Sequence, residues 1–186
     1  MTFSLYFIYL QRTDWVVLSA SCFLLLICLS DTLYGKIPNL FNLVCLLFAL
    51  GYHYHQQGAP GLGMSLLGLL SGLALFIVPF LMGGMGAGDV KALAVLGALL
   101  GPQNILQVFI YTGLVGGLMG LIQCLFVPQL RQTCLVWIQS LRLGLLPDKT
   151  LREPRGHNLR FPYAAAIAMG YYAYLHWGGL LKLLTT

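Results

Sequence analysis

Charged side chains are what this chain has least of. Asp, Glu, Lys and Arg make up 8% of its 186 residues, and only five residues are acidic, whereas a soluble domain carries about 25% charged residues. Hydrophobic residues reach 59%, which excludes a disordered chain. The net charge is +5, but the basic residues stand between apolar runs without forming a patch, so no nucleic-acid partner is expected. The composition therefore predicts a protein that folds in the lipid bilayer.

The chain also lacks paired cysteine motifs. None of its five cysteines has CxxC spacing, and four lie inside apolar runs, where a small polarisable side chain packs well. Neither a disulfide framework nor a cysteine-ligated zinc site is expected. His53 and His55 form a His-x-His pair, but no carboxylate or thiol accompanies them, so a polar position at the membrane interface is favoured over a metal site. We expect neither a metal nor a cofactor.

Apolar runs divide the chain into six candidate membrane spans, since a crossing helix needs about 20 mostly apolar residues. Residues 1–10 are also apolar, but polar residues 11–14 separate them from the first span, and we expect an interfacial lead-in, with a seventh partial span as the alternative. The sequence thus predicts one all-α domain over residues 1–186, a polytopic membrane helix bundle of about six helices. The six spans are 15–34, 40–54, 62–82, 90–100, 105–127 and 161–181.

Positive charges predict the orientation of this bundle. In the six-span arrangement Lys36, Lys91 and the six basic residues between 131 and 160 lie on one side, and only Arg12 and Lys182 lie on the other. Because basic residues are retained in the cytoplasm, both termini should face away from it. Residues 128–160 then form a basic cytoplasmic or interfacial connection. Its first part, 128–150, fits a helix on the membrane surface and a solvated loop equally well.

Glycines spaced four residues apart recur along the predicted spans. Such spacing lets helix backbones approach closely in lipid, where no hydrophobic force draws helices together. We expect these glycines to serve bundle packing alone: Gly68/Gly72, Gly97/Gly101, Gly113/Gly117 and Gly116/Gly120.

Two of the acidic residues, Asp31 and Asp89, fall at the ends of predicted spans. An ionisable group at membrane depth costs several kcal/mol and is functional by default. Asp31 closes the apolar run of the first span, and Asp89 follows Gly86 and Gly88 at the start of the short fourth span. In the predicted topology both belong to the cytoplasmic face, so the fold can bring the two carboxyl groups together.

Facing carboxyl groups have a specific chemistry. Like charges a few ångströms apart cannot both ionise, so the pair shares one proton; the ionised member takes a proton from water while the protonated member polarises a peptide carbonyl. The dipoles of the helix ends favour Asp89 as the base and Asp31 as the acid. Gly86 and Gly88 lack side chains and tolerate positive φ, so an extended peptide could approach Asp89. Lys91 would either support the carboxylate or extend to lipid phosphate.

These motifs resemble the type IV prepilin peptidase family. The resemblance covers roughly residues 15–180 and implies a bundle of six helices in the inner membrane. It implies a metal-free aspartic endopeptidase, surrounded by lipid, that removes the basic leader from pilin precursors carrying an apolar helix, at the cytoplasmic face. It rests on Gly86-Ala87-Gly88-Asp89-Val90-Lys91, similar to the family's GxGD-x-K motif; on Asp31 followed by Ile37-Pro38-Asn39; and on the proline-containing entry to the last helix at 161–166.

Departures from the family pattern restrict which activity we expect. Larger members carry paired CxxC motifs and a methyltransferase activity, whereas here only about ten apolar residues and a short polar stretch precede the first span and no CxxC occurs. We therefore expect a peptidase without methyltransferase activity, resembling the short forms associated with Flp (tight-adherence) pili. Archaeal preflagellin peptidases share the motif and are one alternative. A non-enzymatic transporter that relays ions or protons through Asp31 and Asp89 is the other; the sequence does not specify an oligomeric state.

Overall fold

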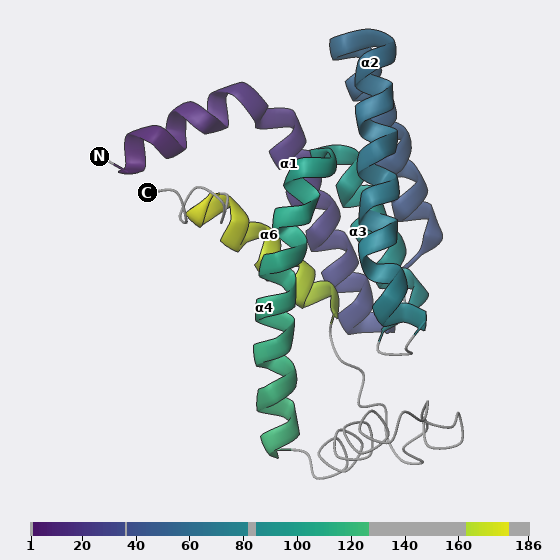
Figure 1. Cartoon of the computed structure of the whole chain (residues 1–186), viewed down its shortest axis with the longest axis vertical. Helices are drawn as coiled ribbons and strands as arrows, with labels where there is room; N and C mark the ends of the chain where they lie inside the picture. Colours follow the sequence, from purple (N-terminus) through teal and green to yellow (C-terminus); the bar gives the residue numbers. More distant parts are fainter. Residues whose placement is uncertain (1, 36, 82–84, 127–162, 179–186) are drawn as a thin grey trace.

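A computed structural model describes residues 2–35, 37–81, 85–126 and 163–178, with only the backbone described for 2–14. This part of the chain is all α-helical, as expected (Figure 1). The described helices are α1 (Thr2–Tyr34), α2 (Asn39–Leu81), α3 (Ala87–Leu100), α4 (Pro102–Phe126) and α6 (Tyr163–Trp177).

Helix α2 consists of two arms that fold back on one another. Gly58 interrupts the helix with φ 65° and ψ −144°, a conformation open to glycine, and Pro60 follows in the first turn of the second arm, where its missing N–H is tolerated. Eight residues of straight helix would separate Gly61 from His53 by about 12 Å. In the structure a Cβ on Gly61 would collide with the carbonyl oxygen of His53, so the chain folds back between them. The first arm (39–57) and the second arm (59–81) therefore match the predicted spans 40–54 and 62–82 (Figure 1).

Helix α3 is enclosed by the rest of the bundle, and Val90 and every residue from 92 to 99 are buried. This explains why it is apolar on all sides rather than amphipathic. The second arm runs antiparallel to it at very short range: the backbones of Gly68 and Gly97 leave no room for a Cβ on either residue. The hydroxyl of Ser65 donates to the carbonyl oxygen of Ala98 at 2.8 Å. The close packing predicted for Gly68 and Gly97 is thus confirmed.

The remaining contacts fix the direction of each helix. His53 on the first arm is hydrogen-bonded to the carbonyl of Leu99, near the end of α3, at 3.0 Å, so this arm runs parallel to α3. Helix α6 runs antiparallel to α4, because Gly170 packs directly against Thr112. We call the end of the bundle where α1 ends and the first arm, α3 and α6 begin the aspartate end.

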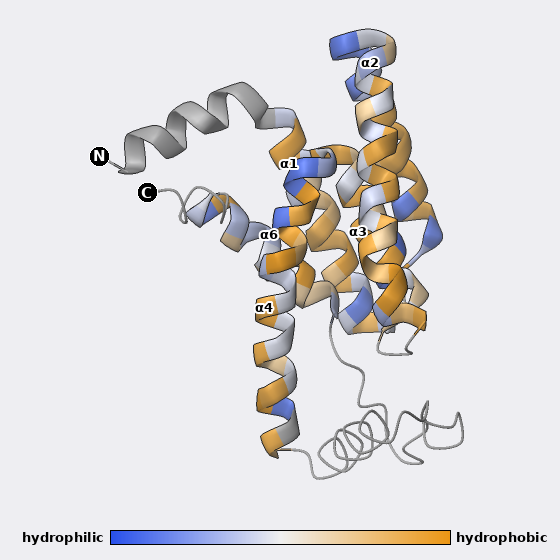
Figure 2. Cartoon of the chain, in the orientation of Figure 1, coloured by the Kyte–Doolittle hydropathy of each residue, from blue (hydrophilic) through white to orange (hydrophobic). Residues whose placement is uncertain are grey.

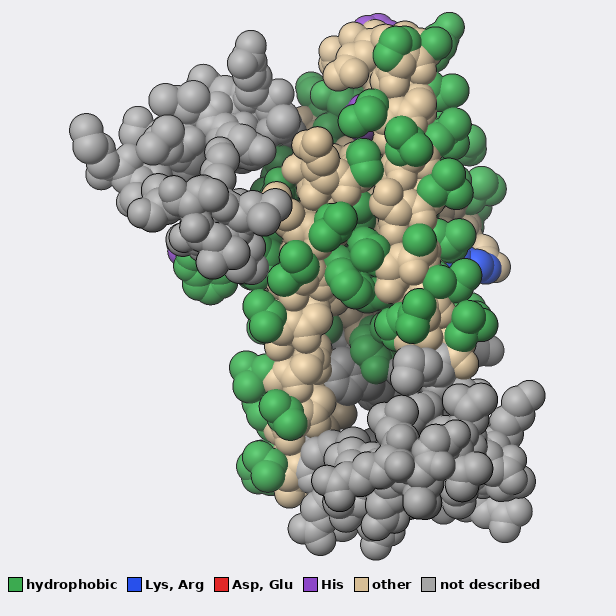
Figure 3. Space-filling view, in the orientation of Figure 1, with side chains coloured by type: hydrophobic (Ala, Val, Ile, Leu, Met, Phe, Trp, Pro, Cys, Tyr) green, Lys and Arg blue, Asp and Glu red, His purple; other side chains and the backbone are tan. Residues whose placement is uncertain are grey.

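The chain is a multi-pass membrane protein. Three stretches of the described helices have the length and apolar composition needed to cross a bilayer: Trp15–Tyr34, Asn39–Leu81 and Pro102–Gln123. Apolar residues extend along these helices (Figure 2), and apolar side chains cover much of the visible surface (Figure 3). With 14 and 15 residues, α3 and α6 are not among these stretches, so six crossings and their orientation stay predictions.

Three expectations stay predictions. Helix α1 continues from Thr2 through the polar residues 11–14, but its N-terminal part bends away from the rest of the helix (Figure 1), so the interfacial lead-in expected for residues 1–10 is not contradicted. No atom of the described residues lies within 4 Å of a Cβ placed on Gly113 or Gly117, so a packing role for this pair is not shown. The basic connection 128–160 lies outside the described residues.

Candidate active site

Asp31 lies in the last turn of α1, partly buried. The N–H of Gly35 donates to the backbone carbonyl oxygen of Asp31 at 2.9 Å, and Gly35 has a φ of 61°. This is a left-handed glycine cap, the common way to end an α-helix. The cap fixes the backbone of Asp31 relative to the short connection that leads into the first arm of α2.

Asp89 lies in the first turn of α3, where free backbone N–H groups favour an anion. Gly86 is the residue that caps this helix, with extended backbone angles of φ −82° and ψ 152°. Its N–H donates to Oδ2 of Asp89 at 3.2 Å, and the N–H of Asp89 donates back to the carbonyl of Gly86 at 3.2 Å. These reciprocal bonds hold the carboxylate against the loop that precedes the helix.

The fold brings the two carboxyl groups to the same end of the bundle, within electrostatic reach. Burial raises the pKa of Asp89 from 3.8 to about 6; the hydrogen bond from Gly86 opposes this, and the negative charge of Asp31 adds to the increase. Asp89 lies outside the three candidate membrane stretches. Burial therefore raises the pKa of Asp89 more than the dipole at the helix N-terminus lowers it, whereas the sequence predicted that the helix dipole would dominate.

A pKa of about 6 still suits Asp89 to the role of a base. At neutral pH such a carboxyl group is mostly ionised, yet it binds a proton more tightly than an ordinary carboxylate. General bases work best when their pKa lies close to the working pH. In a pair that shares one proton, however, the proton resides on the member with the higher pKa, so the assignment of Asp89 as base and Asp31 as acid stays a prediction.

The glycines before Asp89 serve close approach, not unusual backbone angles. Neither Gly86 nor Gly88 is among the glycines with positive φ, so that part of the prediction was wrong. A Cβ on Gly86 would lie 3.3 Å from Oδ2 of Asp89, and a Cβ on Gly88 would lie 3.3 Å from Cβ of Ile37. Both positions are tight enough that any added side chain must displace a neighbour.

Nζ of Lys91 donates to Oδ1 of Asn39 at 3.0 Å, which ties the beginning of α3 to the start of the first arm of α2. The hydrogen bond between two residues so far apart in sequence had no signal in their local patterns.

Tyr163, the first described residue of α6, is a site neighbour that sequence reasoning missed. Its side chain is partly buried. Burial, and to a smaller extent the charge of Asp89, raise the pKa of its hydroxyl. Its position directly after Pro162, at the predicted entry to the last helix, was the signal that could have identified it.

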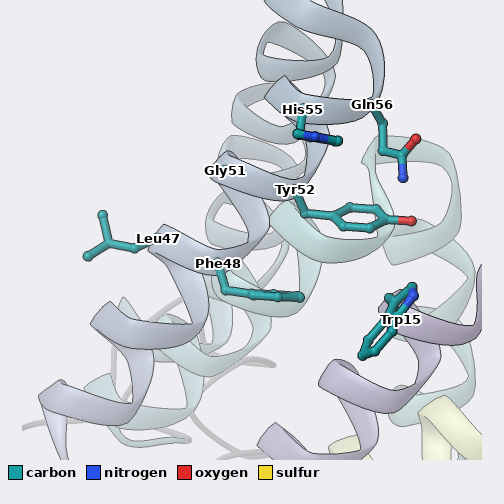
Figure 4. A pocket seen from close by; sticks show the side chains of 7 residues that line it. All are labelled: Trp15, Leu47, Phe48, Gly51, Tyr52, His55 and Gln56. Carbon is teal, nitrogen blue, oxygen red and sulfur yellow. The ribbon is translucent and has the colours of Figure 1, made fainter.

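A pocket of about 470 Å³ lies between Trp15 of α1 and the first arm of α2, away from the aspartate end (Figure 4). Phe48 and Tyr52 point toward Trp15, and His55 and Gln56 lie above them. No acidic residue lines this pocket. The described residues contain no group of three or more His, Cys, Asp or Glu side chains placed to hold a metal ion.

Comparison with known proteins gives one match. The model of a family described as the Type IV leader peptidase family matches residues 18–121. The match includes α3, both arms of α2, the second half of α1 and most of α4, and so contains Asp31, Asp89 and Lys91. No curated protein and no solved structure matches the chain.

Proposed function

The chain belongs to the Type IV leader peptidase family, and on that premise we propose that Asp31 and Asp89 are its catalytic pair. Family membership makes the chain an aspartic endopeptidase with prepilin substrates, and it decides against the transporter alternative. The observation that carries the proposal is the electrostatic coupling of a carboxyl group at the end of α1 to one at the start of α3. Coupled carboxyls are what metal-free peptide hydrolysis by this route requires.

In the proposed reaction the two carboxyl groups divide the proton transfers. Ionised Asp89 takes a proton from water as the water oxygen attacks the scissile carbonyl carbon, and protonated Asp31 gives its proton to the carbonyl oxygen. The tetrahedral intermediate then collapses. The leaving nitrogen receives the proton held by Asp89, and Asp31 regains its proton from the hydroxyl of the intermediate, which returns both residues to their starting states.

We propose that the aspartate end faces the cytoplasm of the inner membrane. The undescribed segment 127–162, which holds six basic residues, joins the end of α4 to the start of α6 at this end of the bundle. Lys36 and Lys91 belong to the same end, and basic residues concentrate in cytoplasmic loops. The substrate would be a Flp-type precursor whose basic leader stays in the cytoplasm while its apolar helix lies in the lipid.

Cleavage of precursors by the full chain in liposomes tests this proposal. Wild type should release the leader from a Flp-type precursor faster than from another type IV prepilin or from a preflagellin, and a chelator should not slow it. Asp31→Asn and Asp89→Asn should each lower the rate by about 10²- to 10⁴-fold, the usual contribution of general acid–base groups. Gln103→Ala, at an exposed position at the start of α4, is the matched control and should cleave normally. Full activity in both Asn variants would contradict the catalytic assignment, and a preference for preflagellin would contradict the substrate.

A further inference from the structure

Asp31 and Asp89 lie on different helices, so their separation depends on what holds those helices together. The cap at Gly35 closes the last turn of α1 directly on the carbonyl of Asp31. Residues 37–39 follow and begin the first arm of α2. A displacement of this connection is therefore passed through the cap to the backbone of Asp31.

The same connection contacts α3 on both sides of Asp89. Just before Asp89, the side chain of Ile37 packs on Gly88, where a Cβ would lie 3.3 Å from Cβ of Ile37. Just after it, Lys91 donates to Asn39 at 3.0 Å. We call Ile37, Asn39, Gly88 and Lys91 the clamp.

We propose that Asn39 and Lys91 are positioning residues, and that their hydrogen bond sets the distance between the carboxyl groups of Asp31 and Asp89. The inference rests on the proposed function, because this distance matters when the two carboxyls share a proton. The interaction of two charges weakens as their separation grows. A catalytic group displaced by about 1 Å can lose on the order of 100-fold in rate.

The geometry favours this indirect role of Lys91 over direct stabilisation of a carboxylate, because its ammonium group donates to the amide oxygen of Asn39. Lys91 therefore acts on the carboxyl pair through the position of Asn39.

Kinetics of prepilin cleavage by the full chain in liposomes test the clamp. Asn39→Ala and Lys91→Met should each lower kcat by about 10- to 100-fold and leave KM within about twofold. Because both changes remove one hydrogen bond, the double variant should be no slower than the slower single variant. Lys91→Arg keeps a donor and should retain at least about a third of wild-type kcat. Gln103→Ala should match wild type.

The pH profile separates positioning from a general loss of structure. In Asn39→Ala the carboxyls should move apart, so the charged member of the pair holds the shared proton on its partner less strongly, and the alkaline limb of kcat/KM shifts to lower pH. Partial misfolding would instead lower the rate at every pH without moving that limb. Wild-type kcat in both single variants, multiplied losses in the double variant, or an unmoved alkaline limb would each overturn the inference.

Helical circular dichroism shows whether Asn39→Ala folds. If it does not fold, Gly88→Ala provides the test instead. Gly88→Ala pushes on Ile37 from the other side of Asp89 and should produce the same drop in kcat and the same shift of the alkaline limb. Failure of the inference is distinct from failure of the function. If wild type cleaves and Asp31→Asn and Asp89→Asn do not, but the clamp variants match wild type, the clamp alone is wrong. If wild type cleaves none of the precursors, the proposed function is wrong, and so is the inference that rests on it.

Discussion

Replacing Asp89 with Asn should inactivate the protein and at the same time stabilise it at neutral and alkaline pH. The pKa of Asp89 rises from 3.8 to about 6 in the folded chain, and each pKa unit corresponds to about 1.4 kcal/mol. Ionised Asp89 therefore lowers the free energy of unfolding by about 3 kcal/mol relative to a neutral side chain. Asn has nearly the same shape, is neutral at every pH, and still offers an oxygen to the N–H of Gly86.

The stabilisation should depend on pH with a definite sign. The folded chain binds the proton of Asp89 more tightly than the unfolded chain, so the stability contributed by protonation is complete below about pH 4 and is lost as the pH rises through about 6. Asp89→Asn should exceed wild type by up to about 3 kcal/mol at about pH 8 and match it at about pH 4.

Unfolding by SDS in mixed micelles, followed by helical circular dichroism at both pH values, measures this difference. Gln103→Ala serves as the control, because a neutral exposed position should show no pH-dependent difference from wild type. Asp31→Asn should give a smaller gain from the same cause, since it removes only the contribution of Asp31 to the pKa of Asp89. A variant Asp89→Asn that is less stable than wild type at alkaline pH, or that differs equally at both pH values, would refute the argument from burial.

Three further changes test the packing. Gly68→Ala should lower the free energy of unfolding by about 1–3 kcal/mol, because its Cβ would collide with the carbonyl oxygen of Gly97; Gly63→Ala, in open space on the same arm, is its control and should be neutral or stabilising. Gly117→Leu should be tolerated within about 0.5 kcal/mol, as nothing lies near that position. Ser65→Ala should cost about 1–3 kcal/mol, because it leaves a buried carbonyl of α3 without its side-chain donor. The same unfolding measurements check all three, and equal losses in Gly68→Ala and Gly63→Ala would contradict the packing described.

The parts of the fold that followed from the sequence are those set by local pattern. Apolar runs predicted the two arms of α2 as separate spans, 40–54 and 62–82. Gly58 and Pro60 lie between them and separate the arms through their own backbone chemistry. The pairing of Asp31 with Asp89 followed from counting spans, since ends of alternate spans face the same side. Both inferences needed only the order of the segments along the chain.

The parts that sequence reasoning missed depend on which faces of the helices meet. Gly113 and Gly117 have the same spacing as Gly68 and Gly72, yet among the described residues only Gly68 and Gly72 of these four have another helix next to them. The spacing shows that a close approach is possible and does not identify a partner. The bond from Lys91 to Asn39 and the approach of Tyr163 to Asp89 likewise arise where separate segments meet.

The enclosure of α3 links packing to chemistry. A carboxyl group at the start of an exposed helix would turn toward water and regain an ordinary pKa, because hydration stabilises the anion. Helix α3 has little freedom to move in this way. Gly97 packs directly on Gly68 of the second arm, and the clamp holds the beginning of the helix. The burial that raises the pKa of Asp89 is therefore maintained by contacts distant from the carboxyl itself. It follows that loosening the second arm by Gly68→Ala should shift the pH profile of cleavage to lower pH, although Gly68 contacts α3 at Gly97, about two turns beyond Asp89.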